Sequence, residues 1–334
     1  MAKIGIVGSG SWGIALAVLL YNNGHHVSVW SALPEEITEM KTTGRHHTLP
    51  DLVLPDGMMF TESLEEVMED KEVLVTAVPS VYVRSTAQKM KPYCREGQII
   101  VNVAKGIEES TLKTLSEILE DELPMADVAV LSGPSHAEEV SRGLPTTCVA
   151  GAHSRKTAEY IQSVFMSEVF RVYTSPDMQG IELGGSLKNV IALAAGIADG
   201  LGYGDNTKAA LITRGIAEIA RLGTAMGGKF QTFCGLSGIG DLIVTCASMH
   251  SRNRRAGILI GKGYSMEEAM KEVKMVVEGV YSAKAALQLS EKYGIDMPIV
   301  EQVNAILFDH KPASEAVKGL MLRDKTIESS DLPW

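Results

Sequence analysis

The sequence predicts an α/β protein: an N-terminal doubly wound, Rossmann-type domain followed by an all-α C-terminal domain. Over the first half of the chain, short strands rich in valine and isoleucine alternate with helices, which is typical of a parallel sheet covered on both faces. From about residue 180 the strand signals stop and long alanine- and leucine-rich segments follow. The length of 334 residues suits two domains, and we place them at residues 1–179 and 180–334.

The first elements are the most informative, because a short apolar strand runs through a glycine-rich turn into an apolar helix. A pyrophosphate needs close backbone amides and the positive end of a helix dipole. The first glycine permits the tight turn, the second leaves room for the phosphates, and the third lets the helix pack on its strand. This strand-to-helix context supports dinucleotide binding over a purely structural turn. The residues predicted to contact the dinucleotide here are Gly8, Gly10, Ser11, Trp12 and Gly13.

The remaining elements follow the same two patterns. Each further strand is short and is followed by a break that contains glycine or proline. Ligands of open α/β sheets bind at the carboxyl ends of the strands, so the substrate is expected between the two halves. The expected elements are strands at 26–30, 72–78, 98–103 and 127–131, edge strands at 145–150 and 170–173, and helices at 183–198, 207–226, 282–293 and 299–308.

Composition excludes several classes of function. A net charge of −10 repels nucleic acid and anionic membranes, so an anionic ligand needs a local cluster of positive groups. The four cysteines show no C-x-x-C spacing, which favours reduced thiols over disulfides or zinc. The adjacent His46 and His47 lack the helical spacing of metal ligands, and no metal is expected. No signal peptide or membrane-spanning run is recognised, which indicates a cytoplasmic protein.

The end of the second strand bears on the choice of cofactor. An NAD-selective site usually has an acidic residue there, which accepts from the ribose 2′-hydroxyl. This strand instead ends at Trp30-Ser31-Ala32, and Glu35 and Glu36 are interpreted as the first turn of the next helix. Without a carboxylate the 2′-phosphate is not excluded, although no arginine replaces it. The sequence therefore favours NADP(H), with NAD(H) also accepted.

Two lysines are candidates for the chemistry. Lys188 lies on an otherwise apolar, glycine-flanked helix, where burial would lower its pKa toward the range of a general acid. The alternative is a lysine that extends to the surface. Lys105 follows a buried strand at the ligand-binding edge of the sheet, where it could reach a substrate oxygen or phosphate. A solvent-facing turn lysine is the alternative there.

A phosphate site is predicted at the run Ser251-Arg252-Asn253-Arg254-Arg255. Ser251 is expected to cap a helix, which would place free amides beside Arg252 and Asn253. The planar guanidinium of arginine matches a phosphate bidentately. A nucleic-acid patch is disfavoured because five residues make a poor electrostatic footprint in an acidic chain.

Two further turns could complete the site. Asp241 closes a glycine-rich loop, where its carboxylate could hold a substrate hydroxyl, orient Lys188, or simply cap a helix. The turn around Gly133 and Ser135 offers amides and a hydroxyl. His136 in the same turn is either a proton carrier or a structural histidine.

Taken together, the ordered motifs resemble the bacterial-type NAD(P)-dependent glycerol-3-phosphate dehydrogenases, which share a 6-phosphogluconate-dehydrogenase-like fold. The resemblance extends over essentially the whole chain and rests on the motifs at 8–13, 104–106, 131–135, 184–189, 235–242, 251–255 and 277–279.

The resemblance implies reversible reduction of dihydroxyacetone phosphate to sn-glycerol 3-phosphate for phospholipid synthesis, by a homodimer with Lys188 as proton donor.

This chain departs from the family pattern at His136, where phenylalanine is common, and near Ala32, where a basic residue or histidine is common. A related dehydrogenase of 3-hydroxy acids or ketopantoate, or a non-catalytic NADPH sensor, is the alternative. The implied substrate residues are Lys105, Gly133, Ser135, Lys188, Asp241, Ser251, Arg252 and Asn253, and the implied cofactor residues include Ser11, Trp12, Ala32, Lys105, Ala137, Arg252, Val276 and Glu278.

Overall fold

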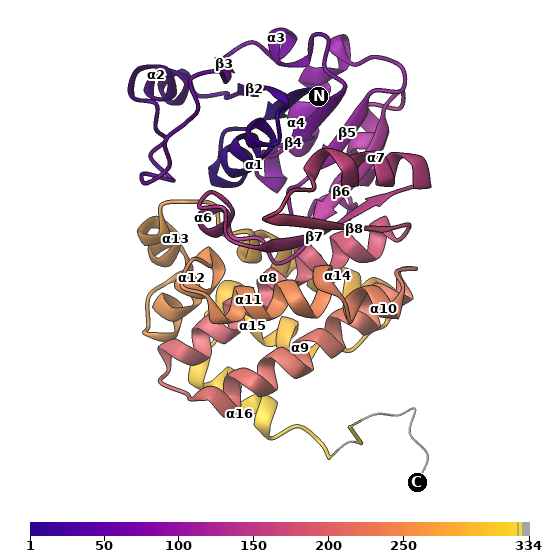
Figure 1. The fold of residues 1–334 in the computed structure, drawn as a ribbon. Helices are drawn as coiled ribbons and strands as arrows, with labels where there is room; N and C mark the ends of the chain where they lie inside the picture. Colours follow the sequence, from indigo (N-terminus) through magenta and orange to yellow (C-terminus); the bar gives the residue numbers. More distant parts are fainter. Residues whose placement is uncertain (326, 329–334) are drawn as a thin grey trace.

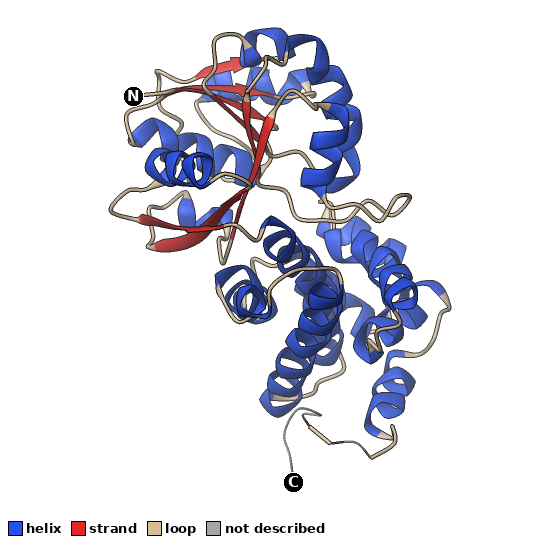
Figure 2. Ribbon diagram, turned by 90° about the vertical axis from the view of Figure 1, so that its right-hand side faces the viewer, coloured by secondary structure: helices blue, strands red, loops and turns tan. Residues whose placement is uncertain are grey.

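The computed structural model describes residues 1–325 and 327–328. Strands occupy the first half of the chain, and the second half is helical in its described residues, so the two halves form separate layers of structure (Figures 1 and 2). The predicted fold class, a Rossmann-type sheet followed by an all-α second half, is confirmed. Helix α8 (Met178–Gly200) directly follows the last strand, begins where the halves meet and passes through the helical half (Figure 1).

The described residues form one eight-stranded sheet in the order β3-β2-β1-β4-β5-β6-β7-β8. All neighbours pair in parallel except β6 and β7, which are antiparallel. The sequence missed the short β3 and wrongly placed β7 at an edge, since it lies between β6 and β8. The strands are β1 Lys3–Val7, β2 His26–Trp30, β3 Met59–Thr61, β4 Val73–Thr76, β5 Ile99–Asn102, β6 Asp127–Ser132, β7 Thr146–Ala152 and β8 Phe170–Ser175.

Helices cover both faces of this sheet, and apolar clusters fill the space between the layers. Parallel strands buried on both faces need such cover, which explains their unbroken apolar character. The helices of the first half are α1 Ser11–Asn22, α2 Pro34–Thr43, α3 Leu64–Met68, α4 Val83–Met90, α5 Leu115–Glu122, α6 Ala137–Val140 and α7 Arg155–Phe165.

The second half packs around α8, which is buried over most of its length. It contains the predicted helices, each longer than or shifted slightly from the sequence estimate. Besides α8 they are α9 Asp205–Ala225, α10 Phe230–Phe233, α11 Asp241–Ala247, α12 Arg252–Gly261, α13 Met266–Val273, α14 Glu278–Tyr293, α15 Pro298–Phe308 and α16 Ala313–Met321.

Small residues let α12 approach α8 closely. A Cβ atom on Gly196 of α8 would lie 2.2 Å from the carbonyl oxygen of Arg254, and one on Gly257 of α12 would lie 2.2 Å from that of Leu193. Both distances are far below van der Waals contact, so the two backbones can touch only at glycine. This packing brings the start of α12 against the middle of α8, where Lys188 lies.

Two helical stretches, Met178–Gly200 and Phe230–Ala247, are long and apolar enough to cross a membrane by length and composition alone. The expectation that no run has sufficient length was therefore too strict. The apolar window of α8 is 94% buried within the protein, as in the core helix of a packed domain. The second stretch is divided among α10, a π-helical turn at Leu236–Gly240 and α11.

Candidate active site

The glycine-rich turn after β1 has the geometry that its sequence predicts. Gly8 has φ +122°, a conformation that L side chains rarely adopt, and its amide donates to the carbonyl of Trp30 at 3.0 Å. A Cβ atom on Gly13 would lie 2.1 Å from the carbonyl oxygen of Gly8, so the third glycine is required for the helix to pack on the turn. Gly10, by contrast, faces open space: in the described structure no atom lies within 4 Å of its Cβ position.

This turn fits a dinucleotide. Helix α1 begins at Ser11, and no side chain of the described residues caps its N-terminus. The first amides of a helix have no intrahelical partner, so those of Ser11 and Trp12 are available to an anion in the space beside Gly10. Uncapped amides next to an open, side-chain-free position are what a pyrophosphate requires.

The open space at Gly10 and the close contact at Gly13 predict different outcomes for alanine variants of these two glycines. We expect Gly10→Ala to fold normally and lose roughly tenfold or more in dinucleotide affinity, because its methyl group occupies the phosphate space. Gly13→Ala is expected to lower the melting temperature, because its methyl group collides with the backbone at Gly8. Calorimetric titration with NADH measures the affinity of Gly10→Ala, and thermal unfolding measures the stability of Gly13→Ala. Equal NADH affinity in Gly10→Ala and wild type would contradict the placement of the phosphates.

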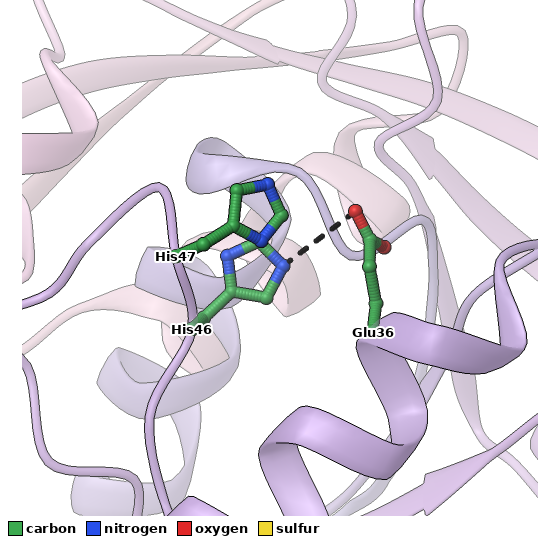
Figure 3. Close-up of side chains that lie close together, drawn as sticks. All are labelled: Glu36, His46 and His47. Atoms are coloured by element: carbon green, nitrogen blue, oxygen red, sulfur yellow. Dashed lines mark ion pairs between the residues drawn. The ribbon is translucent and has the colours of Figure 1, made fainter.

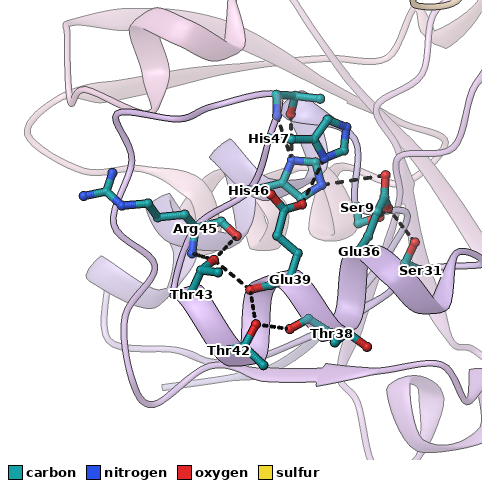
Figure 4. Close-up of polar contacts among 11 residues, drawn as sticks. Ser9, Ser31, Glu36, Thr38, Glu39, Thr42, Thr43, Arg45, His46 and His47 are labelled. Carbon is teal, nitrogen blue, oxygen red and sulfur yellow. Dashed lines mark hydrogen bonds and ion pairs between the residues drawn. The ribbon is translucent and has the colours of Figure 1, made fainter.

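The end of β2 differs from the expectation. Ala32 is exposed, and Glu36 lies in the first turn of α2 as predicted. The Glu36 side chain, however, turns back to accept hydrogen bonds from Ser9 Oγ and from Ser31 Oγ, the latter at 2.7 Å (Figure 4). A carboxylate therefore lies beside the glycine-rich turn, although none follows the strand in the sequence.

A buried group of two lysines and one aspartate lies where the two halves meet. Lys188 Nζ donates to Asp241 Oδ1 at 2.6 Å and to Thr245 Oγ1 at 2.6 Å. Lys105 Nζ donates to Asp241 Oδ2 at 2.6 Å and to the carbonyl of Gly133 at 3.0 Å. Lys188 is only 5% exposed, so the alternative of a lysine reaching the surface is wrong. Lys105 likewise points inward to Asp241 rather than into solvent.

The protonation states of this group follow from burial and mutual charge. Burial lowers the pKa of Lys188 to about 8, against the opposing effect of the Asp241 carboxylate. Burial alone would raise the pKa of Asp241, but the ammonium groups of Lys105 and Lys188 outweigh it and hold that pKa below its usual range. A charged carboxylate thus bridges two cations, one of which can exchange its proton near neutral pH.

The start of α12 forms a second positive region. Ser251 caps the helix as predicted, with its Oγ accepting from the Arg254 amide at 3.2 Å. Asn253 is fixed by bonds to Asn189 of α8 at 2.9 Å and to the amide of Gly279 at 2.8 Å. Within the described part of the chain, the Arg252 guanidinium makes no hydrogen bond or ion pair.

Burial lowers the pKa of Arg252, opposed by the charges of Glu278 and Glu138. Arginine nonetheless stays protonated in proteins. An arginine that is mostly buried and unpaired, beside a helix N-terminus, has the character of an anion site.

The other predicted residues surround these two regions. Gly133 has φ +153° and accepts from Ser135 Oγ at 3.0 Å, in addition to its bond from Lys105. Ala137 begins α6 and is buried. Val276 lies just before α14, and Glu278 at the start of α14 accepts from the amide and the hydroxyl of Ser80, after β4.

Two family models match almost all of the chain. One, described as NAD-dependent glycerol-3-phosphate dehydrogenase N-terminus, matches residues 3–158, and the other, its C-terminus, matches residues 177–318. A protein of Agathobacter rectalis named glycerol-3-phosphate dehydrogenase [NAD(P)+] is 65% identical over 100% of both chains. The chain belongs to the NAD-dependent glycerol-3-phosphate dehydrogenase family.

Other members are similar in sequence and structure. A glycerol-3-phosphate dehydrogenase [NAD(P)+] of Fusobacterium nucleatum is 60% identical over 98% of this chain and 99% of the relative. The crystal structure of the glycerol-3-phosphate dehydrogenase of Coxiella burnetii superposes with a TM-score of 0.93 at 36% identity, covering 96% of this chain and 99% of that one. A ketopantoate reductase of Ralstonia eutropha, at 16% identity and a TM-score of 0.62, shares the fold.

The sequence did not point to two residues that contact predicted site residues. Thr245, which bonds Lys188, lies four residues after Asp241 on one helix face, a spacing that could have identified it. Ser80, which bonds Glu278, follows β4 at the same sheet edge as Lys105 and could have been found by that signal. The interpretation of His136 as a structural histidine with all its hydrogen bonds made is wrong. Its Nε2 is buried and has no hydrogen-bond partner in the described structure.

Proposed function

We propose that the chain catalyses the reversible reduction of dihydroxyacetone phosphate to sn-glycerol 3-phosphate with NADPH or NADH, supplying the backbone of phospholipids. The observation that carries the proposal is the buried Lys188–Asp241–Lys105 group, with a proton-exchanging lysine, beside the strand ends that adjoin the dinucleotide turn. The unpaired Arg252 adds an anion site of the kind that a phosphorylated substrate needs. Bacterial relatives that bear the name of this activity are similar over their full length.

In this proposal the bound dinucleotide supplies a hydride, and the protein handles the proton. Lys188 donates a proton to the carbonyl oxygen of the substrate as the alcohol forms, and withdraws it in the reverse direction. Thr245 and Asp241 fix the direction of its ammonium group by hydrogen bonds from one helix face. Lys105 balances the charge of Asp241 and presents a second cation to the substrate.

The phosphate of the substrate would bind at the start of α12. The Arg252 guanidinium forms no hydrogen bond or ion pair with the described residues, and Ser251 and Asn253 are its neighbours in the sequence. Asn253 is already held by its two hydrogen bonds, so its position costs no ordering when the substrate binds. A dehydrogenase of unphosphorylated hydroxy acids has no need of this region, and a dinucleotide sensor has no need of two converging lysines.

The test is oxidation of NADPH and of NADH by the purified protein with dihydroxyacetone phosphate, run beside unphosphorylated dihydroxyacetone. Rapid turnover that depends on the phosphate supports the proposal. Absence of turnover with both cofactors, while dinucleotide binding persists, would overturn it in favour of the hydroxy-acid dehydrogenases or the sensor.

The pKa of about 8 for Lys188 predicts opposite pH profiles in the two directions. Reduction needs the protonated amine, so kcat should be constant below the pKa and fall about tenfold per pH unit well above it. Oxidation needs the neutral amine, so its kcat should rise tenfold per unit below the pKa and level off above it. Steady-state rates in both directions from pH 6 to 10 test this. If kcat fell on the same side of the pKa in both directions of the reaction, Lys188 would not be the group that transfers the proton.

Three broader features belong to the same proposal. We place the division between the dinucleotide domain and the substrate domain at residues 179 and 180, near the start of α8. We also propose a cytoplasmic location and a homodimer, both supported by the resemblance to the bacterial family. Light scattering of the purified protein measures the oligomeric state.

A further inference from the structure

We propose that Glu36 reads the 2′ position of the adenosine ribose, so that this enzyme binds NAD(H) more tightly than NADP(H). The proposal rests on the proposed function only in taking a nicotinamide dinucleotide as ligand. It adds a residue that determines cofactor preference and that follows neither from the end of β2 nor from the family name. Both cofactors can still be used.

The first argument is position. In a doubly wound fold the pyrophosphate binds at the start of the first helix, and the adenosine ribose lies at the carboxyl end of the second strand. Glu36 joins these two places, because one of its oxygens accepts from Ser9 in the glycine-rich turn and from Ser31 directly after β2. Its side chain retains 14% exposure, so the carboxylate is held but remains accessible.

The second argument is unused hydrogen-bonding capacity. Both serine bonds go to Oε2 of Glu36, whereas Oε1 pairs with His46 Nε2 at the long distance of 3.8 Å (Figure 3). His46 has a fully buried side chain, and its Nε2 has no hydrogen-bond partner among the described residues. The Thr48 amide donates to Nδ1 at 3.3 Å, so Nδ1 acts as an acceptor and Nε2 is the nitrogen that carries an N–H group. The carboxylate acceptor and the imidazole donor thus face each other without a hydrogen bond between them, a pairing suited to a hydroxyl group that donates to one and accepts from the other.

The third argument is charge. His46 is the largest cause that lowers the pKa of Glu36 to about 2, with further lowering from Ser31 and Ser9 against the effect of burial. The group is therefore a carboxylate at any physiological pH. It accepts from a 2′-hydroxyl and repels a 2′-phosphate, which would carry up to two negative charges.

Among the described residues, no lysine or arginine pairs with Glu36. The strand end supplies only Ser31, Ala32 and Leu33. The guanidinium of Arg45, on the loop after α2, donates a hydrogen bond to the carbonyl of Pro50. The carboxylate of Glu36 thus restores the acidic group whose absence from the strand end left NADP(H) favoured by sequence.

A metal site would be the other use of this cluster, since Glu36, His46 and His47 present ligand atoms within 4.8 Å of one another. The ring of His47, however, is 55% exposed and pairs with Glu39 at 3.2 Å. Glu36 itself is engaged by two serine hydroxyls. The ribose interpretation uses the buried nitrogen of His46 that has no hydrogen-bond partner among the described residues, and it leaves these bonds intact.

The test compares Glu36→Gln with the wild type by calorimetric titration of ADP and of adenosine 2′,5′-bisphosphate, followed by NADH and NADPH. These nucleotide fragments carry no nicotinamide, so the readout is independent of turnover. We expect the wild type to bind the fragment without a 2′-phosphate more tightly. In Glu36→Gln the ratio of the two dissociation constants should shift toward the 2′-phosphate by roughly tenfold, about 1.4 kcal/mol.

Glu35→Gln is the matched control, because Glu35 precedes Glu36 in the same helical turn, is exposed, and loses the same charge. It should leave the ratio unchanged. Raising the salt concentration should narrow the difference in the wild type and not in Glu36→Gln. Thermal unfolding checks that each variant is folded. An equal ratio in folded wild type and Glu36→Gln, or tighter wild-type binding of the 2′-phosphate fragment, overturns the proposal even if dihydroxyacetone phosphate is reduced.

Discussion

Lys188→Ala is expected to lower kcat for dihydroxyacetone phosphate by roughly 10³-fold, a typical contribution of a general acid to the rate. Burial lowers the pKa of the Lys188 amine to about 8, which lets it give and regain a proton near neutral pH. Asp241 keeps its partner Lys105 in the variant, so the fold should survive the lost ion pair. Dinucleotide affinity should be nearly unchanged, since none of the described contacts of Lys188 involve the glycine-rich turn.

The control is Lys208→Ala, which also removes a partly buried lysine paired with an aspartate, Asp199, at 2.9 Å. It should keep near wild-type kcat. A small primary amine added to Lys188→Ala should restore part of the rate, which a purely structural role would not allow. Wild-type turnover in Lys188→Ala would remove this lysine from proton transfer.

Much of the fold is encoded in local patterns, which explains why it could be predicted. The glycine-rich turn, the buried parallel strands and the change to helical periodicity near residue 180 each depend on neighbouring residues alone. The structure adds what local patterns lack. Strand β3 has only three residues, too few for a periodic signal. The antiparallel pairing of β7 with β6 is a matter of chain direction, which alternation of residue types does not specify.

The site shows the same division. Lys188 could be selected because an isolated lysine on an apolar helix is conspicuous, and Ser251 because caps have local signatures. The contacts of Asp241 with Lys188 and Lys105 could not be predicted in this way. Lys105 and Asp241 are 136 residues apart in the sequence, and the contacts depend on the packing of α8 against α11 and the sheet. The sequence correctly predicts that Glu36 lies in a helix, but not that its carboxylate lies beside the glycine-rich turn, because its side chain folds back to two serines outside that helix.

Arg252→Ala is expected to raise the KM for dihydroxyacetone phosphate by roughly 10²-fold, the equivalent of about 3 kcal/mol for a lost charge-assisted contact to phosphate. The reason is the unsatisfied state of this side chain: in the described structure its guanidinium has no protein partner, so its contacts are reserved for a ligand. Arg252→Lys should recover only part of the loss, because an ammonium group cannot bind a phosphate with two parallel bonds.

Unphosphorylated dihydroxyacetone provides the internal comparison. If Arg252 binds the phosphate, the variant should use this substrate as poorly as the wild type does, so that the discrimination between the two substrates collapses in Arg252→Ala. Arg221→Ala is the control, since that arginine is exposed and donates to the carbonyl of Asp296 on the far side of the helical half. A KM for dihydroxyacetone phosphate that stays at the wild-type value in Arg252→Ala would refute the phosphate site. A rise in the NADH dissociation constant, with KM unchanged, would assign the arginine to the dinucleotide alone.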